Sequence, residues 1–183
     1  MRVIAGELKG LRLSSPAGLH TRPTPDRVKE SVFNILGARV AGSRFLDLFA
    51  GSGAIGIEAL SRGADEAVFV DDDPAAIGCI RANLIKTKLI GKAKVIAGDA
   101  KSAIRSMLKV ESFGIIYLDP PFGCGALVET LNNPGFAKLL KPDGLIIIES
   151  QASAKATLPD GLRTADLRKY GSIQITMAEK IIP

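Results

Sequence analysis

The stretch "LDPPFG" at residues 118–123 places a carboxylate and two prolines directly after the apolar run "FGIIY". Proline has no backbone N–H and fixes φ, so Pro120 and Pro121 stop the strand and stiffen the turn that follows. An exocyclic amine on a nucleobase is a poor nucleophile, because its lone pair is delocalised into the ring. The Asp119 carboxylate and the Pro120 carbonyl can each accept an amino hydrogen and so direct that lone pair, while Phe122 stacks on the base. We therefore predict that Asp119, Pro120, Pro121 and Phe122 are catalytic, although an Asp-Pro pair by itself indicates only a strand terminator.

A second motif, "DLFAGSGAIGIEAL" at residues 47–60, carries glycines with G-x-G-x-x-G spacing between a predicted strand and a predicted helix. Such glycines let a nucleotide approach the backbone closely, and the helix N-terminus offers unpaired N–H groups. Asp71, twenty residues after Gly51, ends the next predicted strand, where its carboxylate can accept from both ribose hydroxyls. Asp72 and Asp73 follow it, but adjacent carboxylates on an extended chain point in different directions, and we expect no metal.

The surrounding charges favour one nucleotide over another. A dinucleotide oxidoreductase needs a hydride-transfer partner, and the only histidine, His20, lies far from the glycine motif in sequence. S-adenosylmethionine carries no phosphate, and Asp47 can accept from its amino group, whereas Asp47 would repel a pyrophosphate. Asp99 in "AGDAKS" can accept from the adenine amine. The predicted S-adenosylmethionine-binding residues are Asp47, Phe49, Ala50, Gly51, Ser52, Gly53, Asp71, Asp72, Asp99 and Ala100.

These residues need a fold that brings strand ends together. From about residue 44 the hydrophobic pattern alternates between strand-length and helix-length segments, which is typical of an α/β protein. Apolar strands without clean alternation are buried on both faces, as in a parallel sheet between helix layers. In such a sheet the carboxyl ends of the strands meet at one ligand-binding edge. The predicted strands are 44–49, 66–71, 93–98, 113–119, 145–150 and 173–179, the last two expected to form a hairpin with one antiparallel strand.

Local signals mark the helix starts. Thr24 and Asp73 each precede a proline, which is the usual order of N-cap and first helical residue. The segment 25–38 has an apolar helical face that includes Val28 and Phe33. We therefore expect helices beginning at these two points.

Composition limits the class of protein. The 183 residues are 46% hydrophobic, enough for one buried core, so we predict a single methyltransferase domain over residues 1–183. No segment is apolar for long enough to span a bilayer and no secretory signal is present, which predicts a cytoplasmic protein without membrane contact. Cys79 and Cys124 have no paired spacing, so we expect neither a disulfide framework nor a zinc site, with Cys79 in the core.

The excess positive charge is confined to the beginning of the chain. Residues 1–44 hold eight basic and three acidic residues, and the remainder holds sixteen of each sign. We describe residues 1–43 as a basic N-terminal arm and helix, which could bind a polyanion such as RNA or could simply be a solvated surface. The predicted RNA-binding residues are Arg2, Lys9, Arg12, Arg22 and Arg27.

The sequence resembles a known family. "DPPF" is similar to the D/N-P-P-F/Y signature of methyltransferases that act on planar nitrogens, and "FAGSGAIGIEALSRGA" is similar to the cofactor loop of RsmD-type 16S rRNA guanine-N2 methyltransferases. "RVIAGELKGLRL", "TRPTPDRVKESVFNIL" and "RKYGSIQITM" resemble the arm and closing hairpin of that family. The resemblance implies a class I, Rossmann-like fold with seven strands, S-adenosylmethionine as methyl donor, and 16S rRNA on a partly assembled small subunit as substrate. One departure is Asp71, where the family often has Glu.

Residues and resemblance together predict methyl transfer to the N2 amine of a guanine in 16S rRNA, by a protein that we expect to be monomeric. The same tetrapeptide suits other planar amines, so methylation of DNA adenine or protein glutamine is an alternative. A catalytically silent RNA-binding module with the same fold is another, although the intact residues 119–122 argue against it.

Overall fold

A computed structural model describes residues 1–16, 25–108, 112–121, 125–153 and 157–181. Its sheet has seven strands in the order β3-β2-β1-β4-β5-β7-β6. Neighbouring strands pair in parallel except at β7, which is antiparallel to both β5 and β6. The predicted class, a mainly parallel seven-stranded α/β sheet with a C-terminal antiparallel hairpin, is confirmed. The strands are β1 (Arg44–Asp47), β2 (Glu66–Asp71), β3 (Ala93–Ala97), β4 (Phe113–Leu118), β5 (Leu140–Gln151), β6 (Leu162–Tyr170) and β7 (Ile173–Lys180).

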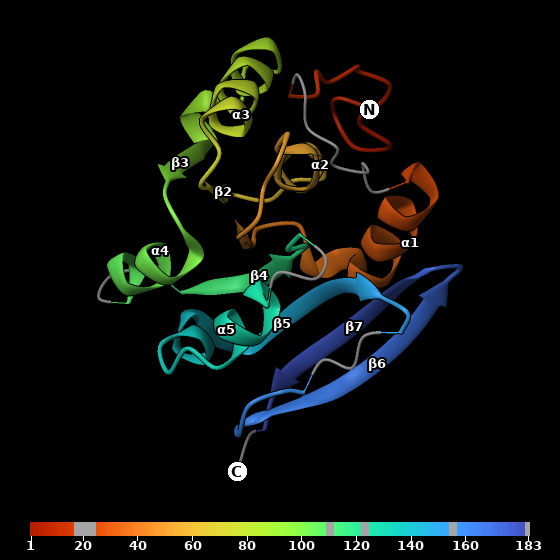
Figure 1. The fold of residues 1–183 in the computed structure, drawn as a ribbon. Helices are drawn as coiled ribbons and strands as arrows, with labels where there is room; N and C mark the ends of the chain where they lie inside the picture. The colour runs from red at the N-terminus through yellow and green to blue at the C-terminus, as the bar shows by residue number, and fades with distance from the viewer. Residues whose placement is uncertain (17–24, 109–111, 122–124, 154–156, 182–183) are drawn as a thin grey trace.

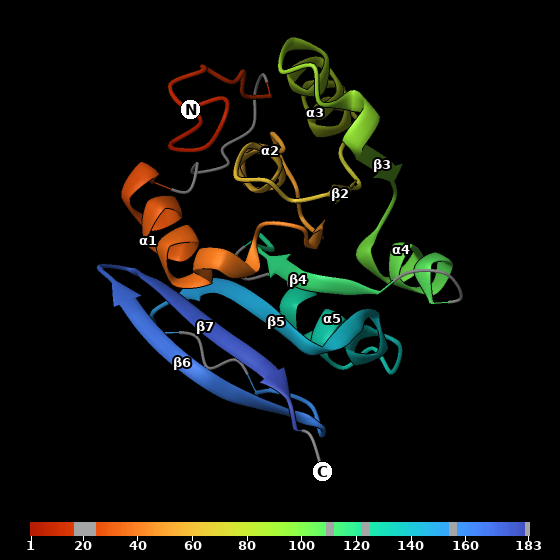
Figure 2. The ribbon, with the colours of Figure 1, turned by 180° about the vertical axis from the view of Figure 1, so that it is seen from behind.

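Helices cover both faces of the sheet, as Figure 1 and the reverse view in Figure 2 show. α1, α2 and α3 lie on one face with the N-terminal segment, and α4 and α5 lie on the other. Successive strand residues point to opposite faces, so Phe45 and Leu46 of β1 enter two separate apolar clusters. None of the helices in the described ranges is long and apolar enough to cross a membrane. The helices are α1 (Asp26–Leu36), α2 (Ala54–Ser61), α3 (Pro74–Lys86), α4 (Ala100–Met107) and α5 (Ala126–Leu131), with short 3-10 turns η1 (Gly37–Arg39), η2 (Ile90–Lys92) and η3 (Phe136–Leu139).

The strand predictions hold except near the C-terminus. The predicted segment 66–71 coincides with β2, whereas β5 starts five residues before the predicted 145. The sequence analysis did not assign β6, which is the first strand of the closing hairpin. β6 lies at the sheet edge, and most of its side chains are exposed, so it lacks the apolar pattern of the buried strands. β7, between β5 and β6, is the single antiparallel strand that was predicted.

Two local predictions need correction. α1 starts at Asp26 with Pro25 at the N-cap, one residue later than predicted, while Thr24 lies outside the described residues. Asp73 caps α3 as predicted, because its carboxylate accepts from the backbone N–H of Ala75 at 2.9 Å. Cys79 is half-buried instead of in the core, and its thiol donates to the Ser14 carbonyl oxygen at 3.3 Å. Cys124 lies outside the described residues.

The first sixteen residues pack against the helices of one face. Val3 and Leu13 are buried, and the segment folds back on itself through an antiparallel bridge between Arg2 and Arg12. Asn83 of α3 fixes the C-terminal end of this segment, because its side chain accepts from the N–H of Ser14 and donates to the carbonyl oxygen of Ser14. The basic arm is thus part of the packed structure at residues 1–16, and its assignment with the rest of 1–183 to a single domain stays a prediction.

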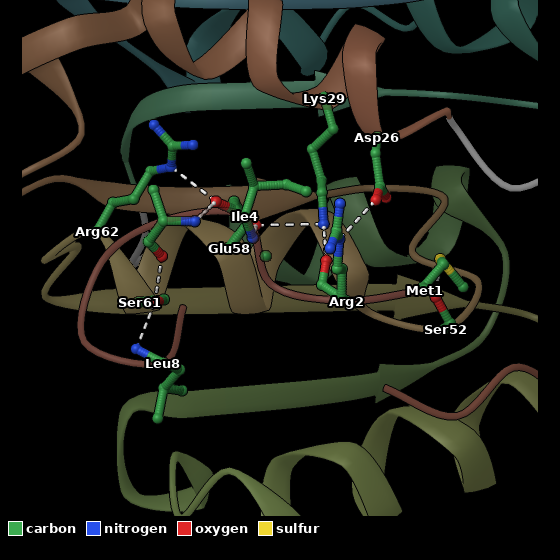
Figure 3. Close-up of polar contacts among 12 residues, drawn as sticks. Met1, Arg2, Ile4, Leu8, Asp26, Lys29, Ser52, Glu58, Ser61 and Arg62 are labelled. Carbon is green, nitrogen blue, oxygen red and sulfur yellow. Dashed lines mark hydrogen bonds and ion pairs between the residues drawn. The ribbon is translucent and has the colours of Figure 1, made fainter. Parts of the chain in front are cut away.

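A buried ion cluster attaches this segment to the body (Figure 3). The Glu58 carboxylate of α2 is completely buried and lies 3.2 Å from Lys29 Nζ and 2.8 Å from Arg62 Nε. The same carboxylate accepts from the backbone N–H groups of Ile4 at 2.8 Å and Ala5 at 3.0 Å. A buried carboxylate is tolerated only when charges and donors surround it, and here α1, α2 and the arm supply them.

Gly6 lets the arm approach the end of α2 closely. Its φ is +82°, and a Cβ at this position would lie 1.8 Å from the Ser61 carbonyl oxygen, so a side chain is sterically impossible without movement. That carbonyl accepts from the N–H of Glu7 at 2.8 Å, and the Ser61 hydroxyl oxygen accepts from the N–H of Leu8 at 3.0 Å. The backbone of residues 5–8 is therefore bonded directly to the last residue of α2.

We predict that Glu58→Gln lowers the free energy of unfolding by about 3 to 5 kcal/mol. The amide leaves the buried Lys29 and the half-buried Arg62 without their countercharge, and its NH2 group faces backbone donors. Urea unfolding measures the change.

The matched control is Glu66→Gln, which breaks the half-exposed Arg44–Glu66 pair at 2.7 Å and is expected to cost less than about 1 kcal/mol. Equal losses in the two variants would contradict the role given to burial at Glu58.

Candidate active site

The aspartates predicted from the sequence meet at one cavity of about 1360 Å³ at the carboxyl edge of the sheet. Asp47, Asp71, Asp99 and Asp119 all line it. They follow or end the adjacent strands β1, β2, β3 and β4, whose parallel pairing delivers their carboxyl ends to the same edge. Small-ligand pockets usually occupy about 300 to 1,000 Å³, so this cavity has room for more than one small molecule.

The glycine turn connects β1 to α2 and is held by Asp71. Gly51 and Gly53 have φ values of +54° and +77°, a region that favours glycine. Asp71 Oδ2 accepts from the Gly51 N–H at 2.7 Å, and Oδ1 accepts from the Asp73 N–H at 3.0 Å. Asp71 thus fixes the turn in addition to facing the cavity. Gly53 precedes α2 and does not line the cavity.

Gly56, the third glycine of the motif, serves packing. A Cβ at Gly56 would lie 2.3 Å from Cε1 of Phe69 in β2, so only glycine lets α2 pack this closely on the sheet. Its backbone N–H donates to Asp47 Oδ2 at 3.1 Å. The glycine therefore positions both the helix and a carboxylate of the cavity.

Asp47 is the buried carboxylate of the cavity, with 1% of its surface exposed. Burial raises the pKa of Asp47 from 3.8 to about 7, the bond from Gly56 opposes this shift, and the nearby Asp71 charge adds to it. A carboxyl group with a pKa near 7 readily loses its proton, and so becomes negatively charged, when a cation binds beside it. Asp47 is therefore suited to bind an ammonium group.

Asp99 is an exposed carboxylate that follows β3, the edge strand of the sheet. It caps α4 by accepting from the Ser102 N–H at 2.9 Å, and this bond lowers the pKa of Asp99. The cap therefore favours the ionised form of Asp99 at the cavity. Ala100, predicted beside it, also lines the cavity, as do Phe49, Ala50, Gly51, Ser52 and Asp72.

The residues of the opening motif follow β4. Asp119, Pro120 and Pro121 line the same cavity as the glycine turn, with Pro120 buried and Pro121 exposed. Phe122, the predicted stacking residue, lies outside the described residues. The structure thus brings the described part of the predicted catalytic group together with the predicted cofactor residues.

Tyr117 and Glu149 are among the cavity residues that the sequence analysis missed. The buried Tyr117 hydroxyl donates to Oε2 of the buried Glu149 at 2.6 Å, and both residues line the cavity. Burial, followed by the charges of Glu149 and Asp119, raises the pKa of Tyr117 well above its usual value, so the hydroxyl keeps its proton. The available signal was an acidic residue, Glu149, inside the otherwise apolar run "LIIIES".

Residues at both ends of the segment 1–16 line the cavity. Met1, Ser15 and Pro16 line the cavity, and Asn83 joins the arm to the glycine turn by donating to the Ser52 carbonyl oxygen at 2.9 Å. The described cations predicted to bind RNA, Arg2, Lys9, Arg12 and Arg27, are exposed and lie outside the cavity lining. Arg2 pairs with Asp26 at 3.0 Å, and Arg22 lies outside the described residues.

Comparisons with known proteins cover nearly the whole chain. The family model described as Conserved hypothetical protein 95 matches residues 1–179. The chain is 46% identical over 150 residues, 81% of this chain and 82% of the relative, to "Putative rRNA methyltransferase YlbH" of Bacillus subtilis (strain 168). It is 37% identical over 164 residues, 90% of this chain and 78% of the relative, to "Ribosomal RNA small subunit methyltransferase D" of Escherichia coli (strain K12). The solved structure "Putative methyltransferase yhhF from Escherichia coli" matches with a TM-score of 0.86 and 35% identity, covering 98% of this chain and 97% of that one.

The raised pKa of Asp47 predicts a pH dependence of stability. With a folded-state pKa of about 7 against 3.8, the folded protein binds more protons than the unfolded chain between these values, so the free energy of unfolding falls as pH rises through this window. Asp47→Asn cannot titrate. Between pH 5 and pH 8 the wild type should therefore lose about 2 to 3 kcal/mol more than Asp47→Asn in urea unfolding.

The control for this prediction is Asp72→Asn, which removes an exposed carboxylate of the same cavity. It should keep the pH dependence of the wild type. Parallel curves for the wild type and Asp47→Asn would show that Asp47 does not titrate in this window.

Proposed function

The chain belongs to the Conserved hypothetical protein 95 family, that of the RsmD-type rRNA methyltransferases, and we propose that it transfers a methyl group from S-adenosylmethionine to the N2 amine of a guanine in 16S rRNA. One observation carries the proposal. Asp119, Pro120 and Pro121 line the same cavity as the glycine turn and the three other strand-end aspartates. Residues suited to bind a methyl donor and residues suited to bind an amine that accepts the methyl group thus line the same cavity.

The donors and acceptors of the cavity fit S-adenosylmethionine. This molecule presents an ammonium, two ribose hydroxyls and an adenine amine, all hydrogen-bond donors, and carries no phosphate. Asp47 would accept from the ammonium, Asp71 from the ribose and Asp99 from the adenine amine, with the glycine turn between them. The phosphates of a dinucleotide would instead face these carboxylates, and Lys29, the one lysine among the described residues of the lining, is paired with Glu58.

The residues of the motif after β4 would handle the amine. When bound, S-adenosylmethionine would supply a methyl group attached to a positively charged sulfur. The sulfur–methyl bond would break as the amine nitrogen bonds to the methyl carbon, and the electron pair of the broken bond would stay on the sulfur. A guanine amine is not basic in its ground state, so Asp119 need only accept one hydrogen while the Pro120 carbonyl accepts the other. As positive charge develops on the nitrogen, Asp119 takes the proton that the amine releases. Two consecutive prolines keep these acceptors rigid, which preserves the orientation of the lone pair.

The substrate that we propose is the small ribosomal subunit or its assembly intermediate, which would place the protein in the cytoplasm. Exposed cations of the arm, Lys9, Arg12 and Arg27, would contact RNA phosphates. The arm is bonded to α2 and also lines the cavity, so RNA held by the arm would be held at a fixed position relative to Asp119.

Labelled methyl transfer tests the function. Tritiated S-adenosylmethionine is offered with unmethylated small subunits, naked rRNA, DNA and protein in parallel, and products are digested to nucleosides and amino acids. We expect label in N2-methylguanosine from small subunits. Label in N6-methyladenine or methylglutamine would identify one of the alternative substrates, and no transfer at all would favour the silent RNA-binding module.

Substitutions at Asp119 test the mechanism. Asp119→Asn keeps an acceptor oxygen but loses the charge, whereas Asp119→Ala loses both, so we predict that turnover falls by about 10² in Asn and by more in Ala. Single-turnover methylation with saturating cofactor and subunits measures the rates.

Thermal melts accompany the rate measurements. If Asp119 only terminates the strand, the variants lose stability but the folded fraction keeps the wild-type rate. A folded Asp119→Ala protein with near wild-type turnover would refute the orienting role.

A further inference from the structure

Glu149 occupies a place beside Asp119 that the proposed function does not use. β4 and β5 pair in parallel, and their last registered pair is Leu118 with Ile148, so Asp119 and Glu149 are the next residues of adjacent strands. Residues two apart on a strand share a face, and Asp119 therefore continues the face of Tyr117, as Glu149 continues that of Ile147. Tyr117 and Ile147 are themselves a registered pair. Both carboxylates line the cavity.

The strand order divides the cavity into two sides. Asp99, Asp71 and Asp47, which suit S-adenosylmethionine, lie at the ends of β3, β2 and β1, all on one side of β4. Glu149 is near the end of β5, on the other side of β4. An amine oriented by Asp119 has the methyl donor on one side, so the rest of its base extends toward Glu149.

The environment of Glu149 fixes its carboxylate. Only 3% of its surface is exposed, and Oε2 accepts from the Tyr117 hydroxyl at 2.6 Å. Tyr117 cannot readily lose its proton, because burial and the nearby carboxylates raise its pKa. A carboxylate has about four lone-pair sites and can accept several hydrogens at once, so the bond from Tyr117 orients Glu149 without preventing it from accepting a hydrogen from a ligand. Burying a carboxylate is costly, which favours a role that needs a negative charge at this position.

The chemistry of guanine supplies that role. The N1–H and the N2 amine of guanine are neighbouring hydrogen-bond donors on one edge of the ring. Adjacent strands are about 4.8 Å apart, so acceptor side chains at the ends of two such strands can each bond one of these donors. Resting on the proposed function, we propose that Glu149 accepts the N1–H of the target guanine and is the residue that selects guanine over other bases. Adenine has an unprotonated N1 whose lone pair would face the Glu149 carboxylate, so the site rejects it.

2-Aminopurine is the base that isolates this interaction. It carries the same 2-amine as guanine but has no hydrogen on N1. The guanosine that the wild type labels in small subunits is first located by nuclease mapping. A synthetic RNA segment with guanosine or 2-aminopurine at that position is then ligated into 16S rRNA and reconstituted into small subunits.

The wild type is expected to prefer guanosine by at least about 100-fold in kcat/KM, since the analogue has no N1–H to donate to the Glu149 carboxylate and places a nitrogen lone pair against it. Glu149→Gln keeps an acceptor for Tyr117 and can turn its amide N–H toward an unprotonated N1. It should lower kcat/KM for guanosine, raise it for 2-aminopurine and reduce the preference to about tenfold or less. Tyr117→Phe, which removes only the orienting hydroxyl, should give an intermediate preference.

The matched control is Glu179→Gln on β7, which is paired with Leu145 in the middle of β5, lies outside the cavity lining and should keep the wild-type preference. A folded Glu149→Gln protein whose kcat/KM falls equally on both bases would assign Glu149 a structural role and overturn the inference. A wild type that methylates both bases equally well would also overturn it. Absence of N2-methylguanosine with unmodified subunits would instead refute the proposed function, so the two failures are distinguishable.

Discussion

The completely buried Glu58 carboxylate is the interaction on which the cavity face of this molecule depends. It needs two cations and two backbone donors, and these come from α1, α2 and the arm. Arg62 also lies over the Phe33 ring, 4.8 Å from its centroid, which adds a cation–π contact between α2 and α1. Because α2 begins directly after the glycine turn, any shift of this cluster would move the turn and the Gly56 N–H that holds Asp47.

The carboxylates at the strand ends have structural and chemical roles at once. Asp71 holds the glycine turn, Asp99 caps α4, and Asp47 receives the N–H of Gly56. These bonds orient each carboxylate toward the cavity before any ligand arrives, which reduces the ordering that binding requires. The burial of Asp47 and the nearby charge of Asp71 cost stability, and the raised pKa of Asp47 is the sign of that cost. A ligand that brings donors and a positive charge would relieve it.

β4 lies at the centre of the proposed chemistry because of its place in the sheet. Strands β1 to β3 lie on one side of β4 and β5 lies on the other. A residue at the end of β4 can therefore face both the methyl donor and the base that accepts the methyl group. Asp119 would orient the amine at this boundary, and Glu149 would read the base from the adjacent strand. The proposed catalysis and the proposed base selection thus depend on the same parallel register of β4 with β5.

The sequence by itself determined the parts of the site that are local in the chain. The glycine turn and the Asp119–Pro121 turn are each formed by a few consecutive residues. The strongly apolar strands indicated a parallel sheet, in which the carboxyl ends of the strands lie at one edge. Only the tertiary structure decided that β6 pairs at the edge, that the arm packs on Glu58, and that Glu149 lies beside Asp119. Exposed β6 has no apolar pattern to reveal it, and Glu58 resembles any charged helix residue until its partners are known. For Glu58 and Glu149 the physical reason is that their contacts join segments 30 or more residues apart, where strand register and side-chain packing, not local pattern, set which atoms meet.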